Sequence, residues 1–203
     1  MWIDLTHTIK HQMPKTDGDF GVRLQRIKDR SLHGYEDHIL TMNMHTGTHI
    51  DLPGHFLDCP KTLRDMPLDK CIFEALKFTY EGTDTVPILP GMETLKKGMA
   101  VVIATGFDRY YFEVSTAHKH PLLSQALINF LVNKGIGLIA LDTPSPDVAP
   151  YQAHTALLAH NIPIIENLKN AVKLPENTPF TLYAIPLKIA TSASPVRVFA
   201  KIT

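Results

Sequence analysis

The chain has 203 residues, of which 44% are hydrophobic and 20% are charged, as is usual for a globular domain with a substantial core. Its 20 basic and 20 acidic residues give a formal net charge of zero, so the basic surface that a nucleic-acid partner would need is not expected. No leader peptide or apolar membrane span is recognisable, and the chain has only two cysteines. We therefore expect a soluble cytoplasmic protein with reduced thiols and no membrane partner.

The first half of the sequence predicts strands separated by polar loops. Strands are expected at 1–9, 22–28, 36–44, 71–80 and 100–105. The segment 11–21 contains Pro14, two glycines and two aspartates, and the segment 58–70 is rich in proline and charged residues, so both are expected to be loops. The continuous apolar run at 100–105 is typical of a strand buried on both faces.

The second half alternates helices with strands. Helices are expected at 122–133 and 151–160, the first of them ending at Lys134-Gly135, a common helix C-terminus. A turn or short helix is expected at 167–171. Strands are expected at 136–141, 162–165, 180–189 and 195–202. Because no repeat or linker interrupts this order, the sequence predicts a single strand-rich α/β domain over residues 1–203.

The most informative segment is His45–Phe56, which reads His-Thr-Gly-Thr-His-Ile-Asp-Leu-Pro-Gly-His-Phe. His45, His49, Asp51 and His55 are all odd-numbered, so an extended backbone would project them from one side. Neutral imidazole nitrogens and ionised carboxylate oxygens are the ligands that a divalent transition metal needs. The segment therefore predicts a metal site at the end of the strand at 36–44 and in the loop after it.

Further ligands would have to come from distant segments, where each candidate also has an ordinary structural explanation. Asp142 follows a buried strand, but an aspartate before Thr-Pro commonly forms a turn. His154 lies on an apolar helix, where a histidine is by itself typical of the core. Glu166 follows an apolar strand and could cap a helix or form a salt bridge. The other histidines are interpreted as structural or surface residues, with His7 the most notable: His7, His11, His33, His38, His118, His120 and His160.

The segment His45–Phe56 resembles the signature of the cyclase family, which includes kynurenine formamidases and isatin hydrolases. The resemblance continues in order along nearly the whole chain. The matching blocks are Asp4–Ile9, Thr105–Tyr110, Leu141–Asp147, Ile164–Leu168, Pro186–Ile189 and Ser194–Arg197. It implies a swivelling β/β/α fold and a homodimer or a larger homo-oligomer.

The resemblance also implies a hydrolase with two divalent metal ions, usually zinc and sometimes manganese. Its metal ligands would be His45, His49 and Asp51, together with two that come from outside the signature, His154 and Glu166. Asp51 and Glu166 would bridge the two ions, and His55 would transfer protons.

The activity implied is hydrolysis of a non-peptide amide C–N bond in a small molecule. The best single guess is an arylformamidase that converts N-formyl-L-kynurenine to L-kynurenine and formate in tryptophan catabolism. Hydrolysis of isatin or another cyclic amide is one alternative, and metal binding without turnover is another. An oxygen-activating enzyme is a third, because two histidines and one aspartate superficially resemble a facial triad.

One departure from the family pattern concerns the substrate. Family members often carry Pro-x-Trp-Pro-Gly-Asp, or its tyrosine version, in the first loop, and the aromatic residue contacts the substrate. This chain reads Pro-Lys-Thr-Asp-Gly-Asp over residues 14–19, which puts Thr16 at the substrate-contacting position. Because threonine cannot stack on a ring, we expect weaker binding of aryl substrates there.

Overall fold

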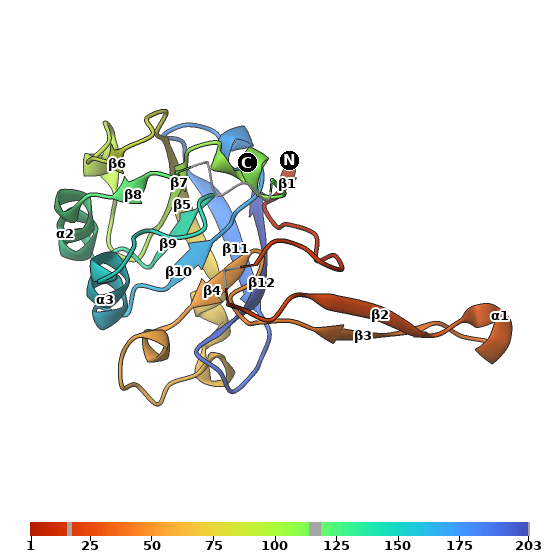
Figure 1. Ribbon diagram of the computed structural model, residues 1–203. Coiled ribbons are helices and arrows are strands. Elements are labelled where there is room, and N and C mark those ends of the chain that lie inside the picture. The colour runs from red at the N-terminus through yellow and green to blue at the C-terminus, as the bar shows by residue number, and fades with distance from the viewer. Residues whose placement is uncertain (16–17, 114–118, 203) are drawn as a thin grey trace.

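A central sheet dominates the computed structural model, which describes residues 1–15, 18–113 and 119–202 (Figure 1). Its strands are β1 (Trp2–Asp4), β4 (His49–Asp51), β5 (Ile72–Thr79), β7 (Ala100–Ala104), β9 (Leu138–Leu141), β10 (Ile164–Glu166), β11 (Phe180–Pro186) and β12 (Ala193–Lys201). The strand order is β1-β12-β11-β5-β7-β9-β10-β4, and β4 also pairs with the start of β12. The strands from β12 round to β4 therefore close into a barrel, and β1 lies outside the ring.

Two helices, α2 (Gln125–Lys134) and α3 (Gln152–Ala159), cover one side of this barrel (Figure 1). The apolar runs of β7 and β9 are buried on both faces, as expected for parallel strands beneath helices. Val102 and Leu138 belong to the core inside the barrel, whereas Val101 and Ile139 pack in the layer beneath the helices. The strand-rich α/β class expected from the sequence is therefore confirmed.

Several predicted boundaries were wrong because local pairing or capping moved them. The helix expected at 122–133 begins only at Gln125, since the Ser124 side chain accepts the Leu127 N–H. The two leucines before it form β8 (Leu122–Leu123), which pairs with β6 (Thr85–Val86). The strand expected at 1–9 ends at Asp4, where continuous pairing with β12 ends.

Short 3-10 turns occupy several of the connections. They are η1 (Pro53–His55), η2 (Leu63–Asp65), η3 (Leu68–Cys71), η4 (Met92–Thr94), η5 (Phe107–Tyr110) and η6 (Ala171–Lys173). The loop predicted at 58–70 thus contains η2 and most of η3. The turn expected at 167–171 becomes helical only at its last residue, where η6 begins.

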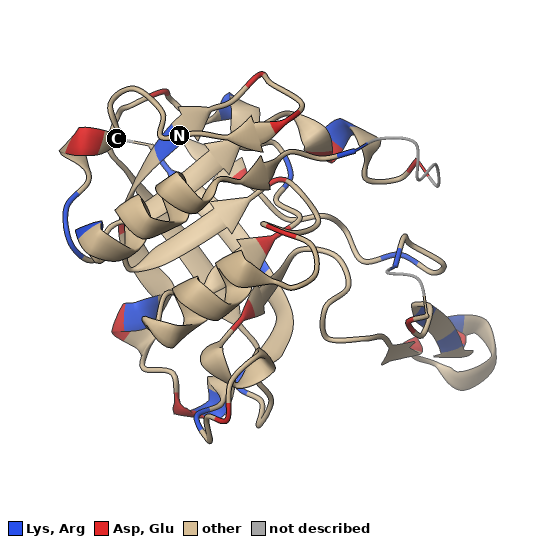
Figure 2. Cartoon of the chain, turned by 60° about the vertical axis from the view of Figure 1, so that its left-hand side comes forward, with Lys and Arg blue, Asp and Glu red and all other residues tan. Residues whose placement is uncertain are grey.

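A hairpin arm projects from the barrel (Figure 1). It consists of β2 (Arg23–Lys28), β3 (Asp37–Thr41) and the short helix α1 (Arg30–His33) at its tip. Figure 2 shows basic and acidic residues of the described chain scattered over both the arm and the barrel. Among the described residues, no helix is both long and apolar enough to span a membrane.

Candidate metal centre

The pairing of β4 with β10 places polar residues from distant parts of the chain side by side. These strands are antiparallel, and His49 lies directly opposite Glu166 in their register. Since alternate residues of a strand share a face, Asp51 projects beside His49. All three residues are buried. One face of this strand pair therefore carries an imidazole and two carboxylates that are almost wholly shielded from solvent.

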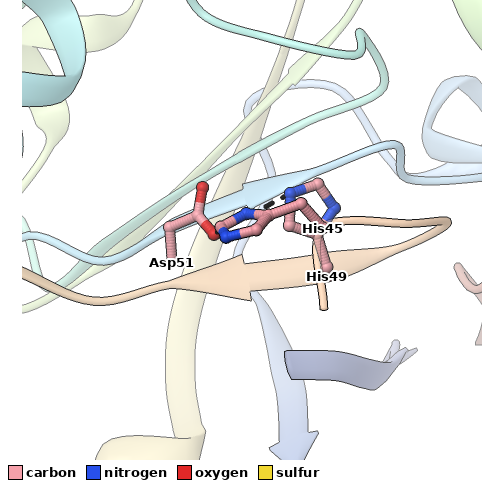
Figure 3. Close-up of side chains that lie close together, drawn as sticks. All are labelled: His45, His49 and Asp51. Atoms are coloured by element: carbon pink, nitrogen blue, oxygen red, sulfur yellow. Dashed lines mark ion pairs between the residues drawn. The ribbon is translucent and has the colours of Figure 1, made fainter. Parts of the chain in front are cut away.

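His45 reaches the same place from a turn rather than from the strand. Residues 42–48 are not extended, and the turn contains Gly47 with φ of +74°, a conformation that favours glycine. His45 Nδ1 lies 2.9 Å from Asp51 Oδ1, and Figure 3 shows the His45, His49 and Asp51 side chains converging.

The prediction that one extended edge carries all four polar residues was therefore wrong. Only His49 and Asp51 lie on β4, whereas His55 ends the turn η1. The chain is outside any strand from residue 42 to residue 48, which includes His45 and Gly47. It leaves the extended conformation at Pro53, whose ring fixes φ in the helical range.

His154 comes from the first turns of α3 and faces Glu166 and Asp51. Its Nε2 lies 3.2 Å from Glu166 Oε1 and 3.9 Å from Asp51 Oδ2. His49 Nε2 lies 3.2 Å from the other oxygen of Glu166, Oε2. The structure thus brings together the five residues His45, His49, Asp51, His154 and Glu166, which we call the polar cluster.

The polar cluster contains two groups of potential metal ligands that share Asp51. His45, His49 and Asp51 form one group, and Asp51, His154 and Glu166 form the other. Among the described residues, buried polar atoms without a hydrogen bond include His49 Nε2, Asp51 Oδ2 and Glu166 Oε1. Such atoms are costly to bury unless a cation or a proton satisfies them. Imidazole and carboxylate donors in this arrangement fit a pair of divalent ions.

The carboxylates govern the electrostatics of the buried histidines. Burial lowers the pKa of His49, but Glu166 and Asp51 outweigh it and raise that pKa to about 9. Burial also lowers the pKa of His154, but Asp147 and Glu166 raise it to about 9. Burial raises the pKa of the Asp51 carboxyl, but the neighbouring histidines bring it below its usual value. A metal ion must displace protons from this centre, so its affinity should increase with pH.

His55 lies beside the polar cluster without joining either ligand group. Its ring centroid is 4.1 Å from that of His45 and 6.1 Å from that of His154. The side chain is exposed to the cavity in front of the cluster. Burial of part of the ring lowers its pKa, and Asp51 opposes this shift. His55 is therefore a mostly neutral imidazole at neutral pH, free to exchange protons with a bound molecule.

The cavity in front of the polar cluster has a volume of about 1230 Å³ and an aromatic lining. One aromatic segment, Phe107–Phe112, contributes Phe107, Tyr110, Tyr111 and Phe112 to it. Phe56 packs on His154 with ring centroids 4.6 Å apart. Thr16 lies outside the described residues. The sequence identified Thr105–Tyr110 only as a block that matches the family and did not predict that these aromatic residues line a cavity, because an aromatic side chain in a loop gives no local sign of facing a ligand.

Asp142 has a structural role. Its carboxylate accepts hydrogen bonds from the backbone and hydroxyl of Thr105 and from Gly106 N–H, at 2.7–3.0 Å. Burial raises the pKa of Asp142 to about 6, although these hydrogen bonds act to lower it. These bonds hold the turn that leads into the aromatic segment.

Two histidines interpreted as structural or surface residues lie close to the cavity. His120 lines it, and its buried Nε2 has no hydrogen-bond partner among the described residues. His7 is buried and stacks on Tyr111 at 4.0 Å, and burial lowers its pKa to about 4. Neither belongs to a group of potential ligands formed by the described residues.

Known proteins resemble this chain over nearly its whole length. Kynurenine formamidases from Bacillus thuringiensis subsp. konkukian and Bacillus mycoides are 29% and 30% identical, with 97–98% of this chain and 95–97% of each relative covered. The solved structure of isatin hydrolase A from Labrenzia aggregata, bound to benzyl benzoate, superposes with a TM-score of 0.88 at 23% identity. That alignment covers 100% of this chain and 94% of the hydrolase.

A structure described as a predicted metal-dependent hydrolase from Bacillus stearothermophilus also shares the fold, with a TM-score of 0.81 at 23% identity and coverage of 98% and 97%. The model of the Cyclase family matches residues 3–148. This match includes the signature histidines and covers most of the chain, and the fold agrees with it. The chain therefore belongs to the Cyclase family.

Proposed function

We propose that this protein is a metal-dependent amidohydrolase that cleaves the C–N bond of an aryl formamide. N-formyl-L-kynurenine, which would give L-kynurenine and formate, is the substrate we favour. The observation that carries the proposal is the pair of ligand groups sharing Asp51, with the unengaged imidazole of His55 beside them. The resemblance to kynurenine formamidases over 97–98% of the chain supports this choice of substrate.

The polar cluster would hold two divalent ions, with zinc the favoured metal and manganese the second choice. His45, His49 and Asp51 would hold one ion, and Asp51, His154 and Glu166 would hold the other. When bound, the two ions supply a water nucleophile of lowered pKa and polarise the scissile carbonyl. The two carboxylates offset only half of the four positive charges, which keeps the centre electrophilic.

His55 would carry the proton that amide hydrolysis must move. An amide nitrogen is a poor leaving group until it is protonated. His55 is exposed to the cavity and lies outside both ligand groups. It can therefore accept a proton from the attacking water and donate it to the departing nitrogen. Its lowered pKa keeps the ring in the neutral, proton-accepting form at pH 7.

The aromatic lining suits a planar substrate. Phe107 and Tyr110 line the cavity, where an aryl group would contact their rings, while the formyl carbon would lie against the polar cluster. The shared fold with an isatin hydrolase is the observation that favours a second substrate, isatin.

The deciding experiment is a substrate panel with zinc-loaded protein. N-formyl-L-kynurenine, formanilide, isatin and a cyclic amide should be compared by kcat/KM. We expect the two formamides to be hydrolysed best. Preference for isatin would assign the second substrate, and no turnover at all would leave a metal-binding protein. The oxygen-activating alternative predicts oxygen consumption, which redox-inert zinc does not support.

Two further features complete this proposal. A homodimer or larger homo-oligomer is expected, which analytical ultracentrifugation would test. A cytoplasmic location agrees with the free thiols of Cys59 and Cys71.

A further inference from the structure

Among the described residues, Asp147 makes the shortest side-chain contact to a member of the polar cluster. Its Oδ1 lies 2.6 Å from His154 Nδ1. Its Oδ2 accepts the backbone N–H groups of Ala153 at 2.6 Å and His154 at 3.1 Å. One carboxylate thus holds both the start of α3 and the imidazole that this helix carries. Because Oδ1 accepts from Nδ1–H, the lone pair of His154 is placed on Nε2, which faces Glu166.

The loop before Asp147 holds the backbone from which this carboxylate projects. The Ser145 hydroxyl donates to the backbone oxygen of Asp147 at 2.7 Å and accepts its N–H at 3.3 Å. Pro144 and Pro146 flank Ser145 and restrict φ at both positions. Asp147 is 9% exposed. The orientation of His154 is therefore set before any ion binds.

His49 is held by a weaker acceptor. Its Nδ1 lies 2.9 Å from the backbone oxygen of Gly47, which is neutral. An imidazole that donates to a carboxylate is the more basic ligand, since the negative charge raises electron density at the opposite nitrogen. His154 should therefore bind a metal ion more strongly than His49 does.

The charge and the burial of the two ligand groups also favour tighter metal binding at the group that contains His154. The group of Asp51, His154 and Glu166 has two carboxylates, whereas the group of His45, His49 and Asp51 has one. The His154 side chain is 6% exposed and that of His45 is 28% exposed. Attraction between a divalent ion and its ligands is stronger where water is excluded.

From these observations we propose that Asp147 is a positioning residue that makes the Asp51–His154–Glu166 group the tighter of two unequal metal positions. The inference rests on the proposed two-metal centre. It predicts stepwise filling, with the ion beside His154 bound first and retained longest during chelation.

The test measures zinc affinity by calorimetry in two backgrounds that each keep one position. His45→Ala leaves the group that contains His154, and His154→Ala leaves the group that contains His45. In the His45→Ala background, Asp147→Asn should weaken zinc binding by about 10- to 100-fold. In the His154→Ala background, the same change should stay within about twofold, as expected for uncoupled sites.

Controls separate positioning from folding. Thr155→Ala removes a different side-chain contact in the same turn of α3, the hydroxyl bond to Tyr151, and should leave zinc affinity unchanged. Asp147→Glu retains the charge and should restore part of the affinity lost in Asp147→Asn. Thermal unfolding of each metal-free variant shows whether it is folded.

Three outcomes would overturn the proposal. Equal weakening in both backgrounds would make Asp147 a general structural residue, and no weakening in either would remove it from the centre. A weaker position beside His154 than beside His45 would reverse the order. Failure of the unmutated protein to bind zinc would instead refute the proposed centre itself.

Discussion

The polar cluster and the aromatic segment Phe107–Phe112 line the same cavity but are held in different ways. Backbone pairing between β4 and β10 fixes His49 and Glu166, and Asp147 fixes His154. The aromatic segment lies in a connection, anchored at its start by the hydrogen bonds of Asp142. Catalytic geometry benefits from rigid elements, whereas loops accept substitution more easily. Mutations in the polar cluster should therefore change metal content and kcat, whereas mutations in the loops that line the cavity should mainly change substrate preference.

Removing a cluster ligand should have the largest effect. His49→Ala deletes a buried imidazole from the centre of the cluster, so metal content and turnover should be lost together. Elemental analysis of the purified variant, alongside a turnover assay, checks both. Retention of full zinc content would show that His49 is not a ligand.

Replacing His55 should separate proton transfer from metal binding. His55→Ala is expected to lower kcat by roughly 10²- to 10⁴-fold, the usual contribution of a general acid–base group, with metal content unchanged. His160→Ala, a change at an exposed histidine at the end of α3, serves as the matched control and should leave kcat unaltered. If His55→Ala strips the metal instead, the roles of ligand and proton carrier have been exchanged.

Metal removal should expose how far the cluster depends on its ions for stability. An ion that binds only the folded chain, at a thousandfold excess over its Kd, stabilises it by about 4 kcal/mol. Chelation should then lower Tm by about 10 °C, as calorimetry would show. The His49→Ala variant is the control, because chelation should shift its Tm much less. An unchanged Tm for the unmutated protein would argue against tightly bound ions.

The smallest effect is expected from a substitution at the predicted substrate-contacting position, residue 16. Thr16→Trp should lower KM for an aryl formamide by roughly tenfold if about 1.4 kcal/mol of uniform binding is gained, with little change in kcat. An aliphatic formamide should gain less, because it offers no ring to stack on. Thr83→Trp, at an exposed position, controls for the added indole. Equal changes in KM for both substrates would show that residue 16 does not contact the aryl group.

The sequence by itself determined the chemistry of the signature and the class of fold. Histidines and an aspartate within twelve residues indicate metal ligation through their residue types alone. Apolar runs such as 100–105 also predict buried strands from their length and composition. These features are local, so no knowledge of distant contacts is needed to interpret them.

Tertiary structure decided which residues meet. Residue types gave Glu166 and His154 ordinary structural explanations, and only the resemblance to a family singled them out as ligands. Glu166 reaches His49 because β4 and β10 pair in one particular register, which the local pattern of neither strand specifies. His154 reaches the cluster through the packing of α3, and Asp147 through the loop before it. Such contacts depend on the free energy of packing the whole chain. The alternation of polar and apolar residues along one segment indicates only which side chains share a face.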